Sequence, residues 1–519
     1  MISEDLIQQF VKETELFEER IQAFESGEID RKTFKGISGR FGCYAQREKN
    51  YMLRLRFPGG RISKEHLAFL GEKTREYPLE LMKITTCQTI QVHNLSASQV
   101  VSLMREALEQ GIITIGGGGD NPRNVMASPL SGTDREETFD VLPYAEAISD
   151  YLLGRMTELH LPRKLKVAFS NTKENLTHAN MRDLGFIANP DGTFSVYCAG
   201  GLGPNPKMGV LVERHGKPEN VSLYVSAMLR LFTRYGDYKV RAKSRSRYLQ
   251  DTLGEERIKE EYVRCLEEAK KEETPWPVFY AHPVLKSGEG EIEGPRIFPQ
   301  KQPGLYGVSY HPMGGCLTQK NIMVLCEVLK NIPDTEIRLS PDGTMYLLYL
   351  TAKEVPRILE ATGGGGENLF ETSTSCIGVP ICQQGLGCSQ WLLAHCIERV
   401  RKENFPDGVL PRIHISGCPS GCGTHQAASL GFMGCRKKIR GETFPAFRVF
   451  INGQAQEPGS RIGEEAGILP EEIIPEFLAE LGKTIQKSHK SFEEWLPENK
   501  SLFLELVQKY EEPVLDFEA

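Results

Sequence analysis

The sequence repeats itself, and this duplication restricts the possible folds of the chain more than any other feature. When the 519-residue sequence is shifted by 255 positions, PGGRIS (58–63) falls on MGGCLT (313–318), and residues 83–85 fall on the similar residues 338–340. Further matches follow in the same order at slightly smaller shifts: GGGGDN (116–121) with GGGGEN (363–368), LPR (161–163) with LPR (410–412), and LGF (184–186) with LGF (430–432). Chance pairing of glycine-rich turns explains one match more readily than an ordered series, so we infer two copies of a unit of about 250 residues.

Each copy has a mixed pattern of strands and helices. In the first copy, the spacing of apolar residues predicts a strand, a helix, a strand and a helix, over 50–57, 64–77, 84–95 and 96–111. The predicted fold class is therefore α+β, with the two copies paired about a pseudo-two-fold axis. A charged helical stretch (254–273) and a loop-like stretch (274–283) separate the copies.

Four cysteines of the second copy have a spacing that indicates a metal centre. SCIGVPIC supplies Cys376 and Cys382, and SGCPSGCG supplies Cys418 and Cys422. The surrounding glycines and prolines let the backbone approach a small inorganic group closely. Four thiolates are the ligands of a [4Fe–4S] cluster, whereas structural zinc usually has shorter spacings than that between Cys376 and Cys382. An iron–sulfur cluster is the favoured interpretation, and zinc or buried thiols are the alternatives.

Basic residues of the first copy stand where the matched residues of the second copy are neutral. The sequence matches place Arg54 opposite Ser309 and Arg123 opposite Thr374, and they place Pro129 opposite Pro380. The same matches place Lys164 and Lys166 opposite Ile413 and Ile415, and two lysines two residues apart on a strand project on one face. Each basic residue alone is typical of a solvated surface, but the four together predict a binding site for one anion.

The composition excludes several classes of function. The net charge of −7 gives no general case for nucleic acid as a partner, and no apolar run is long enough to span a membrane. The acidic amphipathic start lacks the features of a secretory leader, so a cytoplasmic location is predicted, where thirteen cysteines are not expected to form disulfides. Cys388, Cys396 and Cys435 are predicted to be core thiols. The basic run 238–248 is interpreted as a solvated helix face or a docking surface for an acidic partner.

Taken together, these motifs resemble one known family. The pattern C-x5-C followed by C-x3-C, in the second half of a duplicated chain, resembles the sirohaem-dependent sulfite and nitrite reductases. MLRLRFPGG, NPRNVMASPLSG, LPRKLK and GCPSGCG also occur in the family's order, so the resemblance covers nearly the whole chain. It implies an internally duplicated sulfite/nitrite reductase fold with three lobes around a central cofactor site, and it implies sirohaem and a [4Fe–4S] cluster as cofactors.

The resemblance also implies roles for individual residues. It makes Cys376, Cys382, Cys418 and Cys422 the cluster ligands, and Cys422 also the axial ligand of the sirohaem iron. It places Arg54, Arg123, Lys164 and Lys166 around the substrate anion as the catalytic residues. It assigns sirohaem binding to Lys83, Thr85, Gln88 and Arg163. The chain departs from the family at Cys87, where a TTRQ-like segment usually carries arginine, so that one haem carboxylate is expected to be held differently.

The resemblance divides the chain into seven segments. These are an N-terminal helical extension (1–40), a first ferredoxin-like half-domain (41–112), a first-copy sirohaem and substrate-anion domain (113–275), a linker (276–303), a second ferredoxin-like half-domain (304–362), a second-copy [4Fe–4S]/sirohaem domain (363–480) and a C-terminal helical tail (481–519).

The predicted activity is the six-electron reduction of sulfite to sulfide, of nitrite to ammonia, or of both. Sulfite is favoured because the family's sulfite reductases tend to have lysine at the position of Lys166, where plant-type nitrite reductases tend to have asparagine. A dedicated assimilatory nitrite reductase is the alternative enzyme, and a zinc- or cluster-stapled binding protein is the non-enzymatic alternative. No flavin- or NADPH-binding segment accompanies the motifs, so the expected electron donor is a separate ferredoxin or flavoprotein.

Overall fold

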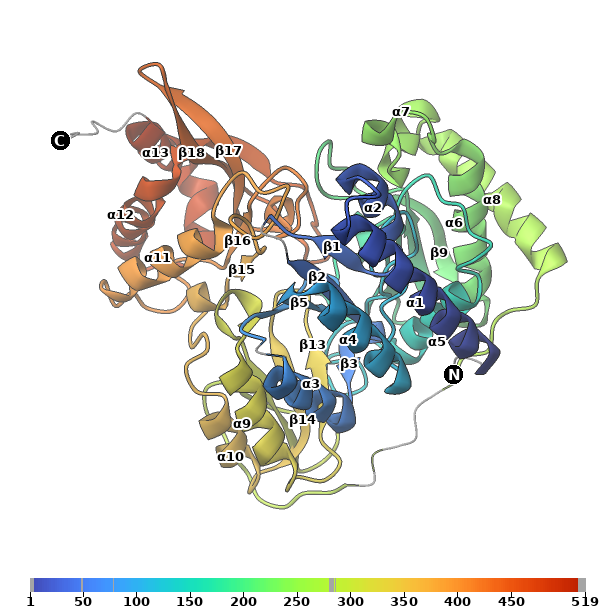
Figure 1. Cartoon of the computed structure of the whole chain (residues 1–519). Coiled ribbons are helices and arrows are strands. Elements are labelled where there is room, and N and C mark those ends of the chain that lie inside the picture. Colours follow the sequence, from blue (N-terminus) through green and yellow to red (C-terminus); the bar gives the residue numbers. More distant parts are fainter. Residues whose placement is uncertain (1–3, 48–49, 78, 280–283, 285, 512–519) are drawn as a thin grey trace. The chain divides into compact units, whose positions relative to one another are not determined.

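The chain folds into two units. The computed structural model describes residues 4–47, 50–77, 79–279, 284 and 286–511, so parts of the predicted extension, first half-domain, linker and tail lie outside the described residues. Unit 1 comprises Met1–Gly201, Lys207–Tyr310 and Cys316–Gly363, and unit 2 comprises Leu202–Pro206, His311–Gly315 and Gly364–Ala519. Figure 1 shows the elements of both units along the chain.

Unit 1 contains the first half of each copy, folded in the same order. The elements of the first copy are β1 (Cys43–Ala45), β2 (Tyr51–Arg56), β3 (Arg61–Ile62), α3 (Lys64–Glu76), β4 (Met82–Ile84), β5 (Thr89–Leu95) and α4 (Ala97–Glu109). Those of the second copy are β10 (Ile297–Pro299), β11 (Leu305–Tyr310), β12 (Cys316–Leu317), α9 (Gln319–Leu329), β13 (Glu336–Leu339), β14 (Met345–Thr351) and α10 (Val355–Ala361). The strands and helices expected in the first copy are confirmed, with a turn dividing the predicted strand 84–95 into β4 and β5.

The two half-domains exchange one short strand each. Strand β12 of the second copy completes the sheet β1-β2-β5-β4-β12, and β3 of the first copy completes the sheet β10-β11-β14-β13-β3. Cys316 pairs with Lys83 in one sheet, and Arg61 pairs with Arg338 in the other. The shift of 255 residues converts each of these pairs into the other, so the exchange obeys the pseudo-two-fold relation between the copies.

Local sequence explains why chain direction changes at the same place in both copies. Gly59 and Gly314 are equivalent under the shift, and both adopt a positive φ, at 60° and 58°, which glycine tolerates without a steric penalty. Ser63 and Thr318 then cap the following helices α3 and α9, because their side-chain oxygens accept backbone N–H groups three residues later. The turn leads each copy into its exchanged strand, and the cap starts the helix that follows this strand.

The two half-domains and the N-terminal helices α1 (Glu4–Glu25) and α2 (Arg31–Ser38) share one hydrophobic core. Phe10 and Phe17 of α1 and Phe34 of α2 are almost fully buried in it. The core continues through both sheets to Leu325 of α9 and Leu347 of β14. A continuous core across both copies explains why they belong to one compact unit.

The remainder of unit 1 is a separate α+β layer with its own core. Its sheet has the order β6-β7-β8-β9, in which β6 and β7 are parallel and the others antiparallel. The elements are α5 (Leu142–Gly154), β6 (Val167–Ser170), β7 (Leu184–Ala188), β8 (Phe194–Cys198), β9 (Val210–Gly216), α6 (Val221–Tyr235), α7 (Leu249–Thr252) and α8 (Glu255–Glu272). At its centre Phe169 stacks on Phe186, and Phe194 packs edge-on against Phe186.

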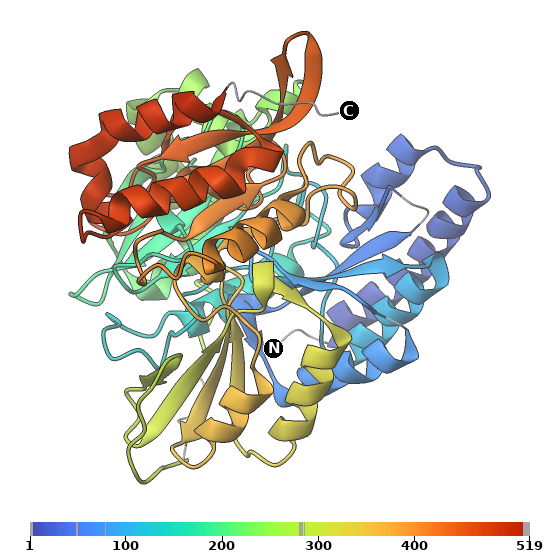
Figure 2. The same ribbon diagram turned by 90° about the vertical axis from the view of Figure 1, so that its left-hand side faces the viewer.

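Unit 2 contains the corresponding sheet of the second copy, in the order β15-β16-β17-β18-β19. Its elements are β15 (Thr374–Ser375), α11 (Ser389–Arg401), β16 (Ile413–Ser416), β17 (Leu430–Ile439), β18 (Glu442–Ile451), β19 (Glu464–Pro470), α12 (Ile474–Gln486) and α13 (Phe492–Glu511). Helices α12 and α13 lie side by side, as Figure 2 shows, and contribute Phe477 and Phe503 to the core.

Strand pairing corrects part of the alignment between the copies. Val167 of β6 pairs with Leu184, and Ile413 of β16 pairs with Leu430, where each partner begins an LGF tripeptide. Val167 and Ile413 are therefore equivalent, and the two LPR tripeptides do not coincide. The counterparts of Lys164 and Lys166 are Leu410 and Arg412, three residues before the isoleucines that the sequence match predicted.

The same correction applies before the first strand of each sheet. Thr374 pairs with His414 as Met126 pairs with Ala168, so the counterpart of Thr374 is Met126 rather than Arg123. Ser128 and Cys376 are equivalent by their hydrogen bonds, so an ungapped alignment places Pro129 on Ile377 rather than on Pro380. The predicted pairing of Arg54 with Ser309 is confirmed, because their strand partners Gln91 and Tyr346 are also separated by 255 positions.

Candidate active site

The four predicted ligand cysteines lie on two loops of unit 2 that hydrogen-bond to each other. Cys376 follows β15, and Cys418 and Cys422 lie in the loop after β16. The backbone N–H of Gly417 donates to the Cys376 thiol at 3.1 Å, and the N–H groups of Leu386 and Gly387 donate to the Gly417 carbonyl at 2.7 and 3.0 Å. The loops are therefore closely apposed along their backbones.

Helix α11 begins directly after the first cysteine loop, and its first residues hydrogen-bond to that loop. The Ser389 hydroxyl donates to the Cys376 carbonyl at 2.9 Å, and the Gln390 amide donates to the same carbonyl at 3.0 Å. The Ser389 hydroxyl also lies 3.3 Å from the Cys376 sulfur. These contacts determine where the first cysteine points.

Electrostatics shows that the four thiols lie near one another and would repel as free thiolates. Burial, with a negative charge on Cys422 adding to it, raises the pKa of Cys376 to about 11. Burial is also the main cause of the raised pKa of Cys382, to which Cys422 and Cys418 add. A positively charged metal body among the sulfurs would remove this penalty. The chemistry of the four thiols thus fits a bound metal cluster.

The four cysteines differ in exposure, and this separates one of them from the rest. Cys418 is buried, Cys376 and Cys382 are half-buried, and Cys422 is exposed. In the described part of the chain, no three His, Cys, Asp or Glu side chains are arranged to hold a single metal ion. Cys396 and Cys435 are buried as predicted for core thiols, whereas Cys388 is half-buried and starts α11.

The cationic residues of unit 1 are oriented by the glycine run 116–119. Arg54 on β2 and Arg123 both donate to the carbonyl oxygen of Gly117, and Arg123 also donates to that of Gly119 at 2.8 Å. An added Cβ at Gly117 would lie 2.7 Å from the Thr114 carbonyl oxygen. The run is thus a tightly packed turn whose carbonyl groups orient two guanidinium groups.

Two further cations were missed by the sequence analysis. Arg56 on β2 is 2% exposed and donates to the carbonyls of Ile115 and Arg123, at 2.8 and 3.3 Å. Arg182, after β6, is 3% exposed and interacts electrostatically with Cys87. The alternation of β2 indicated Arg56, two residues from Arg54, but no motif indicated Arg182.

The half-buried Arg54 and the buried Arg56 and Arg123 lie beside the glycine run without carboxylate partners in the described part of the chain. Arg54, Arg56 and Arg123 form no ion pair with a carboxylate in the described residues, and the Nε–H groups of Arg56 and Arg123 have no hydrogen-bond partner there. Burial lowers the pKa of Arg123 to about 10, with Arg54 adding to the effect, and lowers that of Arg56 to about 9, with Arg123 adding. The surroundings therefore favour a bound anion.

Cys87 lies among the same cations. Burial alone would raise its pKa, but Lys166, Arg182 and Arg54 outweigh burial and lower the pKa to about 6. Lys166 also hydrogen-bonds its sulfur. The residue that departs from the family pattern is therefore a thiolate in contact with a predicted catalytic lysine.

Other predicted residues have defined partners within unit 1. Lys83 on β4 is buried, and the Thr85 and Thr89 hydroxyls lie 2.6 Å apart. The Gln88 amide donates to three backbone carbonyls, of Gly59, Ala127 and Leu339, and its oxygen accepts the N–H of Ala127. Gln88 thus joins segments of both copies.

Arg163 and the basic run 238–248 are paired with two acids, the half-buried Asp120 and the buried Asp183. Arg163 and Arg241 both pair with Asp120, at 2.7 Å each. Arg245 pairs at 3.0 Å with the fully buried Asp183, whose carboxylate also accepts the N–H of Lys166. The run forms short turns with Arg247 buried, so its interpretation as a solvated helix face is wrong.

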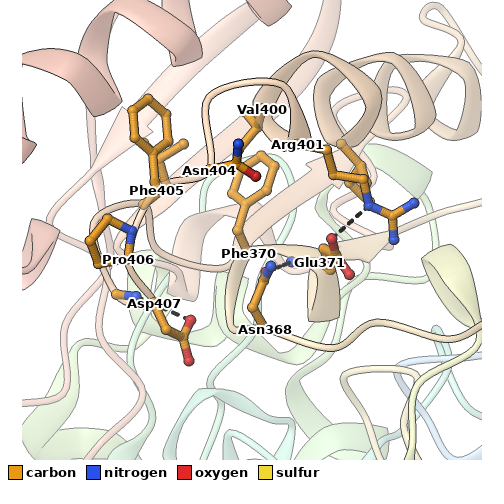
Figure 3. A pocket seen from close by; sticks show the side chains of 12 residues that line it. Asn368, Phe370, Glu371, Val400, Arg401, Asn404, Phe405, Pro406 and Asp407 are labelled. Atoms are coloured by element: carbon orange, nitrogen blue, oxygen red, sulfur yellow. Dashed lines mark hydrogen bonds and ion pairs between the residues drawn. The ribbon is translucent and has the colours of Figure 1, made fainter.

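Two histidines, His178 in unit 1 and His425 in unit 2, make polar side-chain contacts. His178 contacts the Arg182 guanidinium at 3.3 Å, and the Nδ1 of His425 contacts the Ser416 hydroxyl at 2.9 Å. A cavity of about 320 Å³ in unit 2 lies beside the C-terminal end of α11, where Arg401 pairs with Glu371 (Figure 3). None of the predicted site residues lines it.

Comparison with known families matches three stretches of the chain. Residues 118–271 match the nitrite and sulphite reductase 4Fe-4S domain, and residues 44–110 and 298–363 match the nitrite/sulfite reductase ferredoxin-like half domain. The chain belongs to the nitrite and sulfite reductase family. It is therefore an oxidoreductase, and membership implies an iron–sulfur cluster and sirohaem as cofactors.

Individual relatives of the family align over most of the chain. The ferredoxin–nitrite reductase of Synechococcus elongatus is 27% identical over 450 residues, which are 83% of this chain and 85% of that protein. Sulfite reductase [ferredoxin] 2 of Mycolicibacterium paratuberculosis is 25% identical over 477 residues, which are 85% of this chain and 82% of that protein. The structure of Mycobacterium tuberculosis NirA has the same fold, with a TM-score of 0.78, 21% identity and coverage of 93% and 95%.

This membership confirms the predicted α+β fold with internal duplication, since the half-domain occurs twice. The described residues contain no helix that is long and apolar enough to cross a membrane.

Proposed function

We propose that this reductase converts sulfite to sulfide, with nitrite as a second substrate that yields ammonia, and that it receives its electrons from a ferredoxin. The class of reaction and the donor are supported by relatives named ferredoxin–nitrite reductase and sulfite reductase [ferredoxin]. The observation that carries the proposal is the group of guanidiniums at the half-buried Arg54 and the buried Arg56 and Arg123, without carboxylate partners in the described residues.

Buried positive charge of this kind requires compensation. A buried ion without a partner costs several kcal/mol even after the protein has relaxed. A small oxyanion would supply the missing charge and accept hydrogen bonds from the planar guanidinium groups. We propose that Arg54 and Arg123 bind the substrate oxygens, with Arg56 behind them as a second layer of positive charge.

The four cysteines of unit 2 are proposed to hold the iron–sulfur cluster. When bound, the cluster and sirohaem supply the one-electron chemistry that the reduction needs. Cys422 would in addition help to hold the sirohaem. Its support is its exposure, because an exposed thiol among half-buried and buried ones can reach a second group.

Unit 1 supplies the residues proposed to bind the sirohaem carboxylates. Lys83, Thr85 and Arg163 offer an ammonium, a hydroxyl and a guanidinium for this purpose. Gln88 is proposed to support them by holding its own segment in place, because its amide is already engaged by backbone groups.

Lys164 and Lys166 are proposed to deliver protons to the oxygens that leave as water. Both are half-buried on either side of the buried Leu165, as residues on one face of an extended segment are. Arginine presents a planar fork of donors, which suits it to positioning the anion. Lys166 also hydrogen-bonds the Cys87 sulfur, which helps to position its ammonium group.

Steady-state kinetics with reduced ferredoxin and each anion tests the preference for sulfite. We expect kcat/KM to be higher for sulfite, and Lys166→Asn to shift the ratio toward nitrite. A much higher kcat/KM of the unaltered protein for nitrite would establish the alternative, a dedicated assimilatory nitrite reductase.

An absorption spectrum distinguishes a sulfite or nitrite reductase from a non-enzymatic binding protein that is stabilised by zinc or a cluster. We expect the Soret and red bands of a haem together with iron and acid-labile sulfide. A colourless protein that contains zinc would refute the enzymatic proposal. A cytoplasmic location is part of the proposal and is tested by fractionation of cells that express the protein.

A further inference from the structure

The hairpin of β17 and β18 in unit 2 carries exposed basic residues beyond the rest of its sheet. Strand β16 pairs with β17 only as far as Met433, and β19 pairs with β18 only from Ala446 onward, so the hairpin between these residues has no further strand beside it. Figure 1 shows it projecting from its sheet. Arg436 and Lys438 lie on one face of β17, and Arg440 lies in the turn; all three are exposed.

These three basic residues make no close ion pair with an acid in the described residues. Arg436, Lys438 and Arg440 form no ion pair in the described part of the chain, whereas Arg448 of the same hairpin pairs with Glu465 at 2.6 Å. Between residues 436 and 448 the sequence has five basic residues and one acid, although the whole chain carries a net charge of −7. Composition therefore does not account for this local excess of positive charge.

The base of the hairpin touches the cysteine loops. An added Cβ at Gly434 would lie 2.5 Å from the carbonyl oxygen of Gly417, which precedes Cys418, and 3.0 Å from the nitrogen of Gly387. Arg436 lies two residues further along and interacts with Glu471, whose carboxylate accepts the N–H of Cys388 at 3.2 Å. The basic face thus begins beside the loops that hold the proposed cluster.

An apolar side chain is exposed at the same place. Leu386 is 39% exposed, and its backbone N–H donates to Gly417 at 2.7 Å, which keeps it within the cysteine loop. Exposed apolar residues bordered by charge are typical of protein interfaces. The interfaces of transient electron-transfer complexes are small in area.

We propose that the β17–β18 hairpin and Leu386 form the docking surface for the electron donor, an acidic one-electron carrier protein of the ferredoxin class. This inference rests on the proposed function. In each encounter the donor would give up one electron to the cluster that the four cysteines would hold, and the oxidised donor would then have to leave. A weak complex steered by opposite charges meets both needs, because charge raises the rate of association while a small interface allows rapid release.

Charge reversal at the tip of the hairpin tests the proposal. In the cofactor-loaded protein, Lys438→Glu with Arg440→Glu is expected to raise the KM for reduced ferredoxin about tenfold or more at low ionic strength. The difference from the unaltered protein is expected to shrink as salt screens the interaction. Turnover driven by reduced methyl viologen, a small dye that needs no docking surface, is expected to stay the same. Arg436 is left unaltered because it adjoins Glu471.

A matched control separates position from net charge. Lys402→Glu with Lys487→Glu makes the same change in charge at exposed lysines that end α11 and α12. We expect the KM for ferredoxin to change little in this control. An unchanged KM in the hairpin variant, or an equal rise in both variants, would overturn the docking assignment.

The failure of the proposed function would look different. In that case the unaltered protein would reduce neither anion with methyl viologen as the donor. If dye-driven turnover is intact and the hairpin variant retains its KM for ferredoxin, only the docking surface is wrong.

Discussion

The two copies of the repeat place different chemistry at the same backbone position. In the second copy the N–H of Cys376 donates to Ile415 at 3.0 Å, and in the first copy the N–H of Ser128 donates to the equivalent Phe169 at 3.1 Å. The cysteine belongs to the proposed cluster site, whereas its counterpart is a buried serine. The copies differ in side chains and not in strand pairing at this point, so one fold unit supports two kinds of site.

The converse difference occurs on the strands of the half-domains. Arg54 on β2 and Ser309 on β11 have equivalent strand partners, yet only the arginine is held by a glycine carbonyl in a cationic cluster. Backbone geometry does not demand charge at this position, because the second copy folds the same way with serine. The arginines are therefore best explained by ligand binding, and substitutions there should change function more than folding.

The largest expected effect is the loss of cofactors from the second copy. Cys422→Ser should remove or severely disturb both the cluster and the sirohaem, because the thiolate is proposed to bind both. Iron, acid-labile sulfide and the absorption spectrum of the purified protein measure this. The control is Cys388→Ser, half-buried and outside the group of four, which should retain both cofactors. Retention of both by the Cys422 variant would refute its bridging role.

In the first copy, removal of a proposed proton donor should affect turnover but not cofactor content. Lys164→Met is expected to lower kcat by about 100-fold or more, a typical effect of losing a general acid. The control Lys173→Met alters an exposed lysine of the same layer and should leave kcat unchanged. If the Lys164 variant retains normal kcat, this lysine has no part in proton delivery.

Exchanging the residues of the two copies tests the comparison directly. Arg54→Ser gives the first copy the residue of the second and should raise the KM for the anion about tenfold to 100-fold, as loss of a charged hydrogen bond of about 1.5–3 kcal/mol implies. The thermal unfolding midpoint should change little, because Ser309 occupies the equivalent position without disrupting its strand. A large drop in that midpoint with an unchanged KM would mean that Arg54 is structural.

The smallest expected effect concerns the pH dependence of Cys87. Its thiolate is the reactive form, so alkylation by iodoacetamide should increase as the pH rises through about 6, well below the range of an ordinary thiol. Peptide mapping by mass spectrometry measures the modification at Cys87 separately from the other cysteines. Lys166→Met should move the midpoint upward, because it removes a positive charge that lowers the pKa. A midpoint above pH 8 in the unaltered protein would contradict the assigned surroundings.

The sequence by itself determined the duplication, the order of strands and helices in the half-domains, and the four cysteines. These features depend on local patterns and short spacings, which survive in a linear comparison. The family matches, with the half-domain found twice, agree with the duplication. The sequence also identified Ser309 as the counterpart of Arg54 correctly. The shift of 255 positions holds without a gap for these two strands and for their strand partners.

Only the tertiary structure decided the rest, because pairing between distant segments cannot be read from tripeptides. The match of the two LPR motifs gave an alignment that differs by three residues from the one given by the strand pairing of β6 and β16. The residue equivalent to Lys166 is therefore the charged Arg412 rather than a neutral residue. The exchange of β3 and β12 between the half-domains follows from sheet pairing alone. Arg182 joins Cys87 from a segment ninety-five positions away, and folding rather than spacing brings such groups together.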